Sequence, residues 1–489
     1  MSDARVVERL RSTLPADDDH PYRTGAWRPQ ATEWSVDRVE VVEGAIPADL
    51  DGLYVRNTEN PLHPPITRYH PFDGDGMVHA VRFRDGRASY RNRFVRTEGL
   101  VAEQEAGRSL WAGLAESPRS AERTDGLTAR GAMKDASSTD LVVHGGEVLT
   151  SFWQCGELYR LDPDSLDTRG VTRWDGWFPA EGVSAHTKVD EATGELFFFN
   201  YGVAAPYLHF GVVDARGRLV HYEPVPLPGP RLPHDMAITE RFVVLNDLPM
   251  HWDEDLLPQG IHAVRMHDKP SRLAVVPRRG TADDVVWFEA DPTYVLHWTN
   301  AYEDGDTVVL EGFHQGDPSP RPNVDDELWM FRYLALDWMQ TRLHRWRLDL
   351  RTGRCTEERM RDDFTEFGIV SGRLTGRRHR YVYAATGVPG WFLFDGLVRH
   401  DVETGEDHHL RLPDGVYGSE PGVAPKVGGT AEDDAYVVTF TTDVAGDRSE
   451  CLVLDARNIA DGPVARLRLP ERISSGTHAA WAPGSALPA

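Results

Sequence analysis

The sequence predicts an all-β fold built from short antiparallel strands, and three observations indicate this class. Glycine and proline, 44 and 33 of 489 residues, are spread along the chain, as frequent turns require. Alternating apolar runs flank tight-turn dipeptides, as at 78–95 around Asp85-Gly86 and at 141–152 around Gly145-Gly146. A loose motif also recurs, in which an apolar strand end is followed by Asp, a short spacer, a turn glycine and a new strand.

The recurring aspartates favour a β-propeller within the all-β class. They are Asp162, Asp190, Asp214, Asp349, Asp401 and Asp455. An Asp side chain accepts hydrogen bonds from the following backbone and glycine adopts positive φ, so the pairing is typical of turns between strands. The last two intervals are 52 and 54 residues, near the roughly 40–50 residues of one blade. Because the repeat is degenerate, a β-sandwich array stays open as the alternative.

The chain is expected to comprise an N-terminal arm, 1–30, and a single domain, 31–489. Residues 325–346 contain no glycine or proline, and their apolar side chains recur near helical spacing. We therefore expect a helical insertion near 325–342. This helix either docks its apolar stripe on the core or forms an apolar patch that takes substrate from a membrane surface.

Composition restricts the kinds of partner that the protein can have. Fifty-three Lys and Arg residues against 77 Asp and Glu give a net charge of −24, which excludes nucleic acid and favours a small neutral, cationic or apolar ligand. Three widely separated cysteines make no disulfide framework and indicate a reducing compartment. The first residues lack the apolar segment of a signal peptide, and no apolar run is long enough to span a membrane. We expect a cytoplasmic protein.

Four of the twenty histidines have distinctive contexts. Each lies near the end of a predicted strand, often beside small, Pro or Gly residues: His186, His234, His297 and His478. Their spacings of 48, 63 and 181 residues exclude the helical HExxH type of metal site. In a propeller, however, strands of separate blades converge on one axis, so distant histidines can meet there. From the residues alone, ordinary surface or hydrogen-bonded core histidines remain the alternative.

Several segments together resemble the carotenoid cleavage oxygenase family. They include SAHTKVDEATGELFFFNYG, LPHDMAITERFVVLNDLP, HWTNAYEDGD and GTHAAW, and they run in the family's order from about Gly52 to Trp481. The resemblance implies a seven-bladed β-propeller with a few helices and loops forming a cap over the active site. It also implies one non-haem Fe(II) per chain, with four metal ligands, His186, His234, His297 and His478.

The resemblance further implies three glutamates behind the metal ligands. Two fall on Glu366, in EFGIV, and Glu420, in GSEPGVAP. The third falls on Gln154, in TSFWQCGELYRLDP, which departs from the family's pattern. A carboxylate that accepts the second N–H of a ligand histidine orients the ring and raises its basicity. We therefore expect Gln154 to orient its histidine while polarising it less.

The activity implied by the resemblance is a dioxygenase that adds O₂ across a C=C bond of a carotenoid or apocarotenoid, giving two carbonyl products. No catalytic residue beyond the metal centre is expected. One alternative is cleavage of a stilbenoid of the lignostilbene type, but the lysine that holds the phenol in that branch falls on Trp153 here. Isomerohydrolase-like chemistry and a non-catalytic propeller binding module are further alternatives. The oligomeric state and the site of cleavage stay open.

Overall fold

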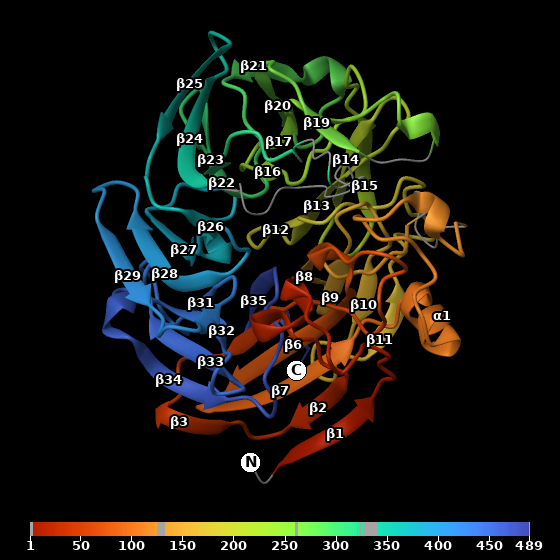
Figure 1. Cartoon of the computed structure of the whole chain (residues 1–489). Coiled ribbons are helices and arrows are strands. Elements are labelled where there is room, and N and C mark those ends of the chain that lie inside the picture. The colour runs from red at the N-terminus through yellow and green to blue at the C-terminus, as the bar shows by residue number, and fades with distance from the viewer. Residues whose placement is uncertain are drawn as a thin grey trace.

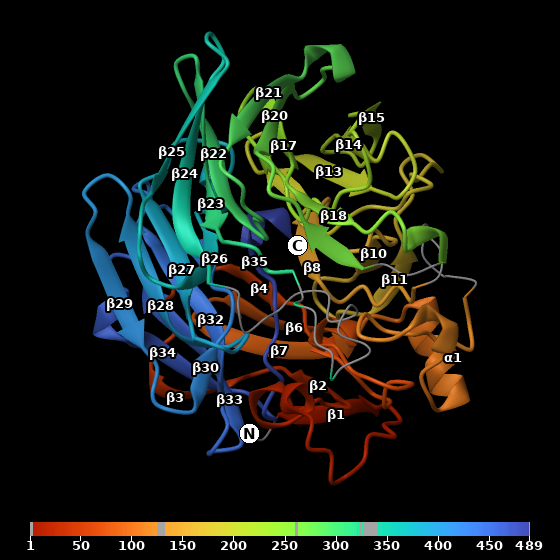
Figure 2. The ribbon, with the colours of Figure 1, turned by 45° about the horizontal axis from the view of Figure 1, so that its top comes forward.

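Antiparallel sheets arranged around a common centre make up most of the molecule (Figure 1). The structure, a computed structural model, describes residues 3–488 except 125–132, 260–262, 320, 322–324 and 326–339. The innermost strands of the sheets gather at the middle of the ring, and the same arrangement is visible when the molecule is tilted (Figure 2). The ring therefore has an axis toward which residues from distant parts of the sequence point.

Five of the sheets have four antiparallel strands each. Their strands are β8 (Asp140–His144), β9 (Glu147–Ser151), β10 (Tyr159–Leu161) and β11 (Thr168–Val171); β12 (Lys188–Asp190), β13 (Glu195–Tyr201), β14 (Leu208–Val213) and β15 (Leu219–Pro224); β16 (Ala237–Ile238), β17 (Phe242–Asp247), β20 (Ser271–Pro277) and β21 (Val286–Ala290); β22 (Trp298–Asp304), β23 (Thr307–His314), β24 (Arg342–Asp349) and β25 (Arg354–Arg359); and β26 (Thr365–Ile369), β27 (Tyr381–Gly387), β28 (Phe394–Asp401) and β29 (Asp407–Arg411). In each sheet, the strand that comes first in the chain lies nearest the centre (Figure 1).

Two larger sheets, of seven and six strands, combine the two ends of the chain. The first contains β1 (Ala4–Arg9), β2 (Thr32–Val36), β4 (Gly52–Arg56), β5 (Glu59–Asn60), β6 (Asp75–Arg84), β7 (Arg87–Phe94) and β35 (Ala479–Pro483). The second contains β3 (Glu40–Gly44), β30 (Val416–Gly418), β31 (Gly422–Pro425), β32 (Ala435–Asp443), β33 (Arg448–Asp455) and β34 (Pro463–Arg468). Because β35 pairs with β4 and β3 pairs with β34, backbone hydrogen bonds close the ring twice.

The strand pairing corrects the expected fold class, because a seven-bladed β-propeller does not describe it. Within the described parts of the chain, only five sheets have the four-stranded form that is typical of a propeller blade. The two sheets at the chain ends are enlarged by β1, β2 and β3, and β18 (Met250–Trp252) and β19 (Val264–Met266) form a separate two-stranded sheet. The expected number of blades, seven, came from the family resemblance. The degenerate repeat in the sequence carried no information about how the terminal segments pair.

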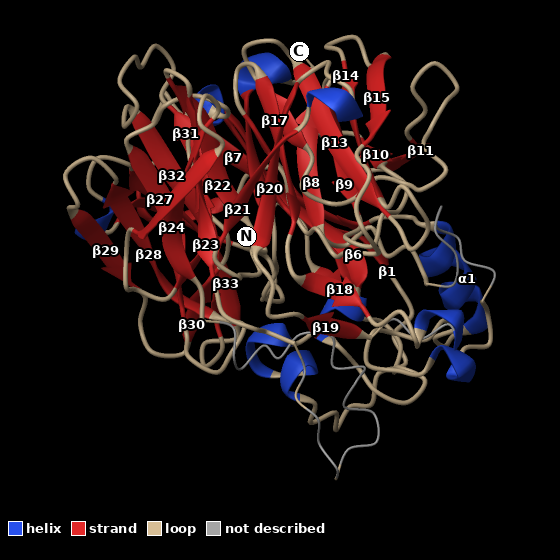
Figure 3. Cartoon of the chain, turned by 90° about the horizontal axis from the view of Figure 1, so that it is seen from above, coloured by secondary structure: helices blue, strands red, loops and turns tan. Residues whose placement is uncertain are grey.

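Helical structure is sparse among the described residues. The single α-helix, α1 (Glu98–Ala106), begins where the Thr97 side chain accepts a hydrogen bond from the Leu100 N–H and ends at the left-handed Gly107. It lies on the same side of the ring as β18 and β19 (Figure 3). Short 3₁₀ helices occupy Pro21–Arg23, Gly25–Trp27, Pro71–Asp73, Pro118–Ser120, Leu257–Gln259, Ala282–Asp284, Gly372–Leu374, Ile459–Asp461 and Gly484–Ala486. Across the described segments, none of the helices has the length and apolar character needed to cross a membrane.

The predicted turns are confirmed. Asp85 and Gly86 join β6 to β7 with φ values of +51° and +66°, as a two-residue hairpin turn requires. The six recurring aspartates each accept a hydrogen bond from the backbone N–H two residues further along the chain. β1, which lies in the expected arm, 1–30, pairs with β2, which lies in the expected domain. The division into an arm and one domain stays a prediction. The expected helix near 325–342 falls mostly on 326–339, outside the described residues.

Ring closure by β35 depends on a glycine that faces a large aromatic side chain. A Cβ added to Gly52 would overlap the indole of Trp481 and lie 2.5 Å from the carbonyl oxygen of Ala482. We predict that Gly52→Ala lowers the free energy of unfolding by about 1–3 kcal/mol, because both groups belong to the pairing strand. Urea unfolding measures this. Gly202→Ala is the matched control, since nothing lies within 4 Å of its added Cβ; equal stability of the two variants would contradict the prediction.

Candidate metal centre

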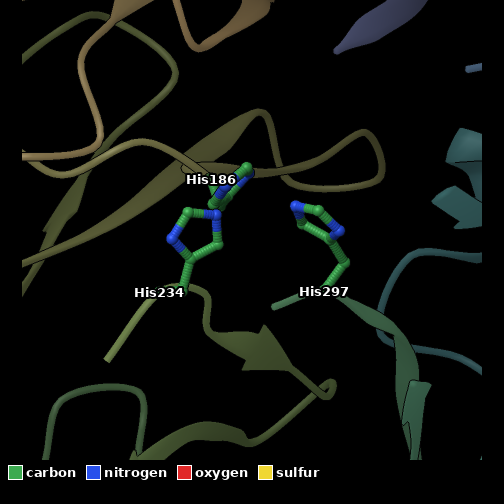
Figure 4. A group of neighbouring side chains, drawn as sticks. All are labelled: His186, His234 and His297. Atoms are coloured by element: carbon green, nitrogen blue, oxygen red, sulfur yellow. The ribbon is translucent and has the colours of Figure 1, made fainter. Parts of the chain in front are cut away.

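The four predicted histidines meet at one end of the ring axis. Each comes just before the first residues of an innermost strand: His186 before β12, His234 before β16, His297 before β22 and His478 before β35. Because these strands start at the same end of the ring, their preceding loops converge. Figure 4 shows the rings of His186, His234 and His297 around one small space, with His234 and His297 each directing a nitrogen into it.

The distances between the imidazole rings are those of a metal-ligand cluster. The ring centroid of His186 lies 4.7 Å from that of His234, 5.0 Å from that of His297 and 4.5 Å from that of His478. One nitrogen each of His186, His234 and His297 lies within 4.8 Å of the others. All four side chains are at least 90% buried. Three of these imidazoles therefore place a nitrogen close enough to share one metal atom, and the His478 ring lies beside them.

The unsatisfied nitrogens of the cluster indicate what it can bind. The Nε2 atoms of His186 and His297 are buried and have no hydrogen-bond partner among the described residues. A buried polar atom without a partner is costly in a folded protein unless a metal, a water or another group satisfies it. Burial also lowers the pKa values of His186, His234 and His297 well below the usual value. These rings are therefore neutral and offer free lone pairs, as metal coordination requires.

Carboxylates anchor the outer nitrogen of three of the four rings. Glu366 Oε2 lies 2.7 Å from Nδ1 of His297, and Glu420 Oε2 lies 3.2 Å from Nδ1 of His478. Each of these two glutamates therefore contacts the outer nitrogen of one of the four predicted histidines. The third carboxylate, Asp140, was missed: its Oδ2 lies 3.0 Å from Nδ1 of His186. These contacts fix each ring's orientation and its tautomer.

Gln154 does not take the place expected of it. Its side chain is 98% buried, but the one ligand ring without a carboxylate, His234, has a buried Nδ1 with no hydrogen-bond partner. Gln154 therefore does not hold this nitrogen. The neighbouring Trp153 is also buried, and its carbonyl oxygen accepts a hydrogen bond of 2.8 Å from the Tyr201 hydroxyl.

Two residues of the histidine cluster and its surroundings have a strained backbone conformation. His186 and Phe367 have φ values of +66° and +54°, in the left-handed region that costs a non-glycine residue about 1–2 kcal/mol. The Phe367 N–H donates a 2.7 Å hydrogen bond to the Glu366 carboxylate, at an irregularity in the pairing of β26 with β27. The Phe367 ring lies 5.1 Å from that of His297 and 5.0 Å from that of His478. The strained residues thus aim a ligand ring and an apolar side chain at the same space.

Fold and site together define a β-propeller-like protein with a buried four-histidine centre suited to a metal ion. The sequence model of the retinal pigment epithelial membrane protein family matches residues 27–483. The chain belongs to this family, that of the carotenoid cleavage oxygenases, as the sequence motifs indicated.

Named relatives agree with this membership over nearly the whole chain. Carotenoid 9,10(9′,10′)-cleavage dioxygenase 1 of Phaseolus vulgaris is 30% identical, covering 96% of this chain and 90% of its own. The solved lignostilbene dioxygenase of Pseudomonas brassicacearum has a TM-score of 0.85 at 28% identity, covering 96% of this chain and all of its own. A cobalt-substituted apocarotenoid oxygenase of Synechocystis has a TM-score of 0.81 at 28% identity, covering 93% and 97%. The prediction of an enzyme of the C=C-cleaving dioxygenase class is confirmed at the level of the family.

The histidine cluster makes a direct prediction about metal binding. His297→Ala should weaken binding of Co(II) by more than the roughly 10–100-fold that is typical when only an outer partner of a ligand is lost. The fold should persist, because the ring closes through backbone pairing elsewhere. Isothermal titration of the metal-free protein, with circular dichroism, tests both statements. His408→Ala, a partly exposed histidine of β29, is the control; unchanged cobalt affinity in His297→Ala would remove His297 from the site.

Metal affinity should also depend on pH. Burial lowers the pKa of His478, but the neighbouring Glu420 carboxylate outweighs this and raises it to about 9. Below that pH the metal must displace a proton, so cobalt affinity should rise about tenfold per pH unit toward pH 9 and then level off.

Titrations between pH 6.5 and 9.5 measure this dependence. Glu420→Gln removes the charge that raises the pKa of His478, so its plateau should begin at lower pH. An affinity in the wild-type chain that does not change with pH would contradict the prediction.

Proposed function

We propose that the chain is a non-haem Fe(II) dioxygenase that cleaves a C=C bond of a carotenoid or apocarotenoid, with O₂, into two carbonyl products. The observation that carries this proposal is the meeting of four buried imidazoles, two of which, His186 and His297, have an Nε2 without a hydrogen-bond partner among the described residues. The proposed ligands are His186, His234, His297 and His478, with one iron per chain.

The donor set fits ferrous iron. Imidazole is a suitable ligand for iron, and four neutral rings leave the ion its full charge. Four protein ligands also leave open positions, which distinguish a reactive centre from a closed structural one. Bound Fe(II) would supply the binding and activation of O₂. The cobalt-substituted relative supports a divalent metal in such a site.

The chain's own residues supply position and a dry environment. Glu366 and Glu420 accept the Nδ1 protons of His297 and His478 and thereby keep the Nε2 lone pairs directed inward. The Phe367 ring lies against the two imidazoles and excludes water from that side. No side chain is needed as general acid or nucleophile, because the oxygen chemistry belongs to the cofactor.

Aromatic side chains lead away from the centre and support an apolar, conjugated substrate. The Phe367 ring lies 6.1 Å from that of Phe392, which lies 6.1 Å from the indole of Trp27. Trp27 contacts Tyr22 at 5.4 Å, and Tyr22 contacts Trp391 at 6.0 Å. Trp391 is 44% exposed. A row of rings from the surface to the metal centre suits a flat polyene, which binds through its faces and edges.

Stilbenoid cleavage is the second candidate, and the likeness to a lignostilbene dioxygenase favours it. Trp153, at the place expected for a phenol-binding lysine, argues for the polyene instead. A non-catalytic binding module has lost support, because the named relatives are enzymes. The cytoplasmic location, the peripheral contact with a membrane through an apolar patch and the oligomeric state stay predictions or open questions.

A substrate panel tests the proposal. The chain, reconstituted anaerobically with Fe(II), is incubated in air with carotenoids, apocarotenals and hydroxystilbenes, and the products are identified by mass spectrometry. We expect aldehydes from the polyenes, with about one iron per chain. Cleavage of hydroxystilbenes alone would show that the substrates are stilbenoids and not polyenes. An iron-loaded chain that cleaves neither class would contradict the proposal. His297→Ala is the inactive control.

A further inference from the structure

Asp140, the first residue of β8, makes an unusually complete set of contacts with one ligand histidine. Its Oδ2 lies 3.0 Å from both the backbone nitrogen and the Nδ1 of His186. Its Oδ1 accepts a 2.7 Å hydrogen bond from the Leu141 N–H. Its strand, β8, packs against the strands that follow His186 and His478, so its place is set by the ring itself.

These contacts fix His186 in two ways at once. The ring bond requires the proton on Nδ1, which leaves the unpartnered Nε2 as the lone pair that faces the cluster. The backbone bond holds His186 at φ +66°, the left-handed conformation in which its ring reaches the other imidazoles. A single carboxylate oxygen thus ties the strained backbone to the ring orientation.

The carboxylates behind the rings are distributed unevenly. His186, His297 and His478 each have one, whereas Nδ1 of His234 has no partner among the described residues. The chain therefore keeps three carboxylates although Gln154 is an amide. One of the three, Asp140, stands where the sequence motifs indicated none.

We propose that Asp140 is a positioning residue of the metal centre, which holds His186 toward the metal and supplies the anionic support that Gln154 cannot. The inference rests on the proposed function, since it presumes a metal among the histidines. Asp140 could instead be a ligand, because it groups with His186 and His478 within 4.8 Å. Both of its oxygens already accept N–H groups, which favours positioning over ligation.

Cobalt binding by matched variants tests this role. Asp140→Asn keeps the shape and removes the charge, so Co(II) should bind about 10–100-fold more weakly. Asp135→Asn is the control: Asp135 is also buried and accepts the N–H groups of Ser137 and Glu157, but has no hydrogen bond to a ligand histidine among the described residues. Its cobalt affinity should not change. Thermal unfolding of the metal-free variants separates lost positioning from lost folding.

Paramagnetic proton NMR of the cobalt-loaded chain gives a second readout that needs no variant. Each ligating imidazole contributes one strongly shifted, exchangeable N–H signal. In the wild-type chain we expect three slowly exchanging signals and one fast one, from His234, whose Nδ1 lacks an acceptor. In Asp140→Asn, one slow signal should become fast.

Four results would count against the inference, and they are distinguishable. Equal cobalt affinity of Asp140→Asn and wild type, or two fast signals in the wild-type chain, would overturn the role of Asp140 while leaving the proposed metal centre intact. Loss of an oxygen donor from the cobalt coordination sphere of Asp140→Asn, seen by X-ray absorption, would make Asp140 a ligand. A wild-type chain that binds neither cobalt nor iron would overturn the proposed function itself.

Discussion

The structure depends on one geometric constraint: the innermost strands that follow the four histidines, β12, β16, β22 and β35, begin at the same end of a closed ring. Side chains placed just before those strands must point into one small volume, however far apart they lie in sequence. His186 and His478 are separated by almost three hundred residues, yet their ring centroids lie 4.5 Å apart. Closure by the pairs β35–β4 and β3–β34 is therefore also what holds the site together.

Electrostatics inside that volume follow from burial. Removing water lowers the pKa of His186, His234 and His297 and raises that of Glu366 to about 8. Neutral imidazoles suit a cation that brings its own charge. A bound cation would favour the ionised form of the carboxyl groups behind the rings, which would balance its charge without occupying its coordination positions. The carboxyl groups thus lie behind the imidazole rings, on the side away from the space that the rings surround. This arrangement leaves the open side to apolar groups such as Phe367.

The sequence predicted the local turns of the fold better than it predicted which distant strands pair. Turns such as Asp85-Gly86 need only two residues with positive φ, so their sequence signal is complete. The pairing of β1, β2 and β3 has no such signal in the sequence. These strands extend the edges of sheets whose other strands come from distant parts of the chain, so their partners depend on the complete fold. The sheet count therefore could not be read from a repeat that is visible only in turns.

The same distinction explains which site residues were found. His186, Glu366 and Glu420 lie in segments whose order along the chain resembles a known family, so motif comparison reached them. Asp140 had no motif, and its bond to the Leu141 N–H is what any aspartate at a strand start can make. Its function depends on a histidine 46 residues away whose backbone is left-handed, and no local pattern encodes that meeting. A family motif shows where a carboxylate usually stands, whereas the structure shows which carboxylate actually reaches the ring. In this chain the two agree at Glu366 and Glu420 and differ at the third position, where Asp140 reaches His186 and the outer nitrogen of His234 has no partner among the described residues.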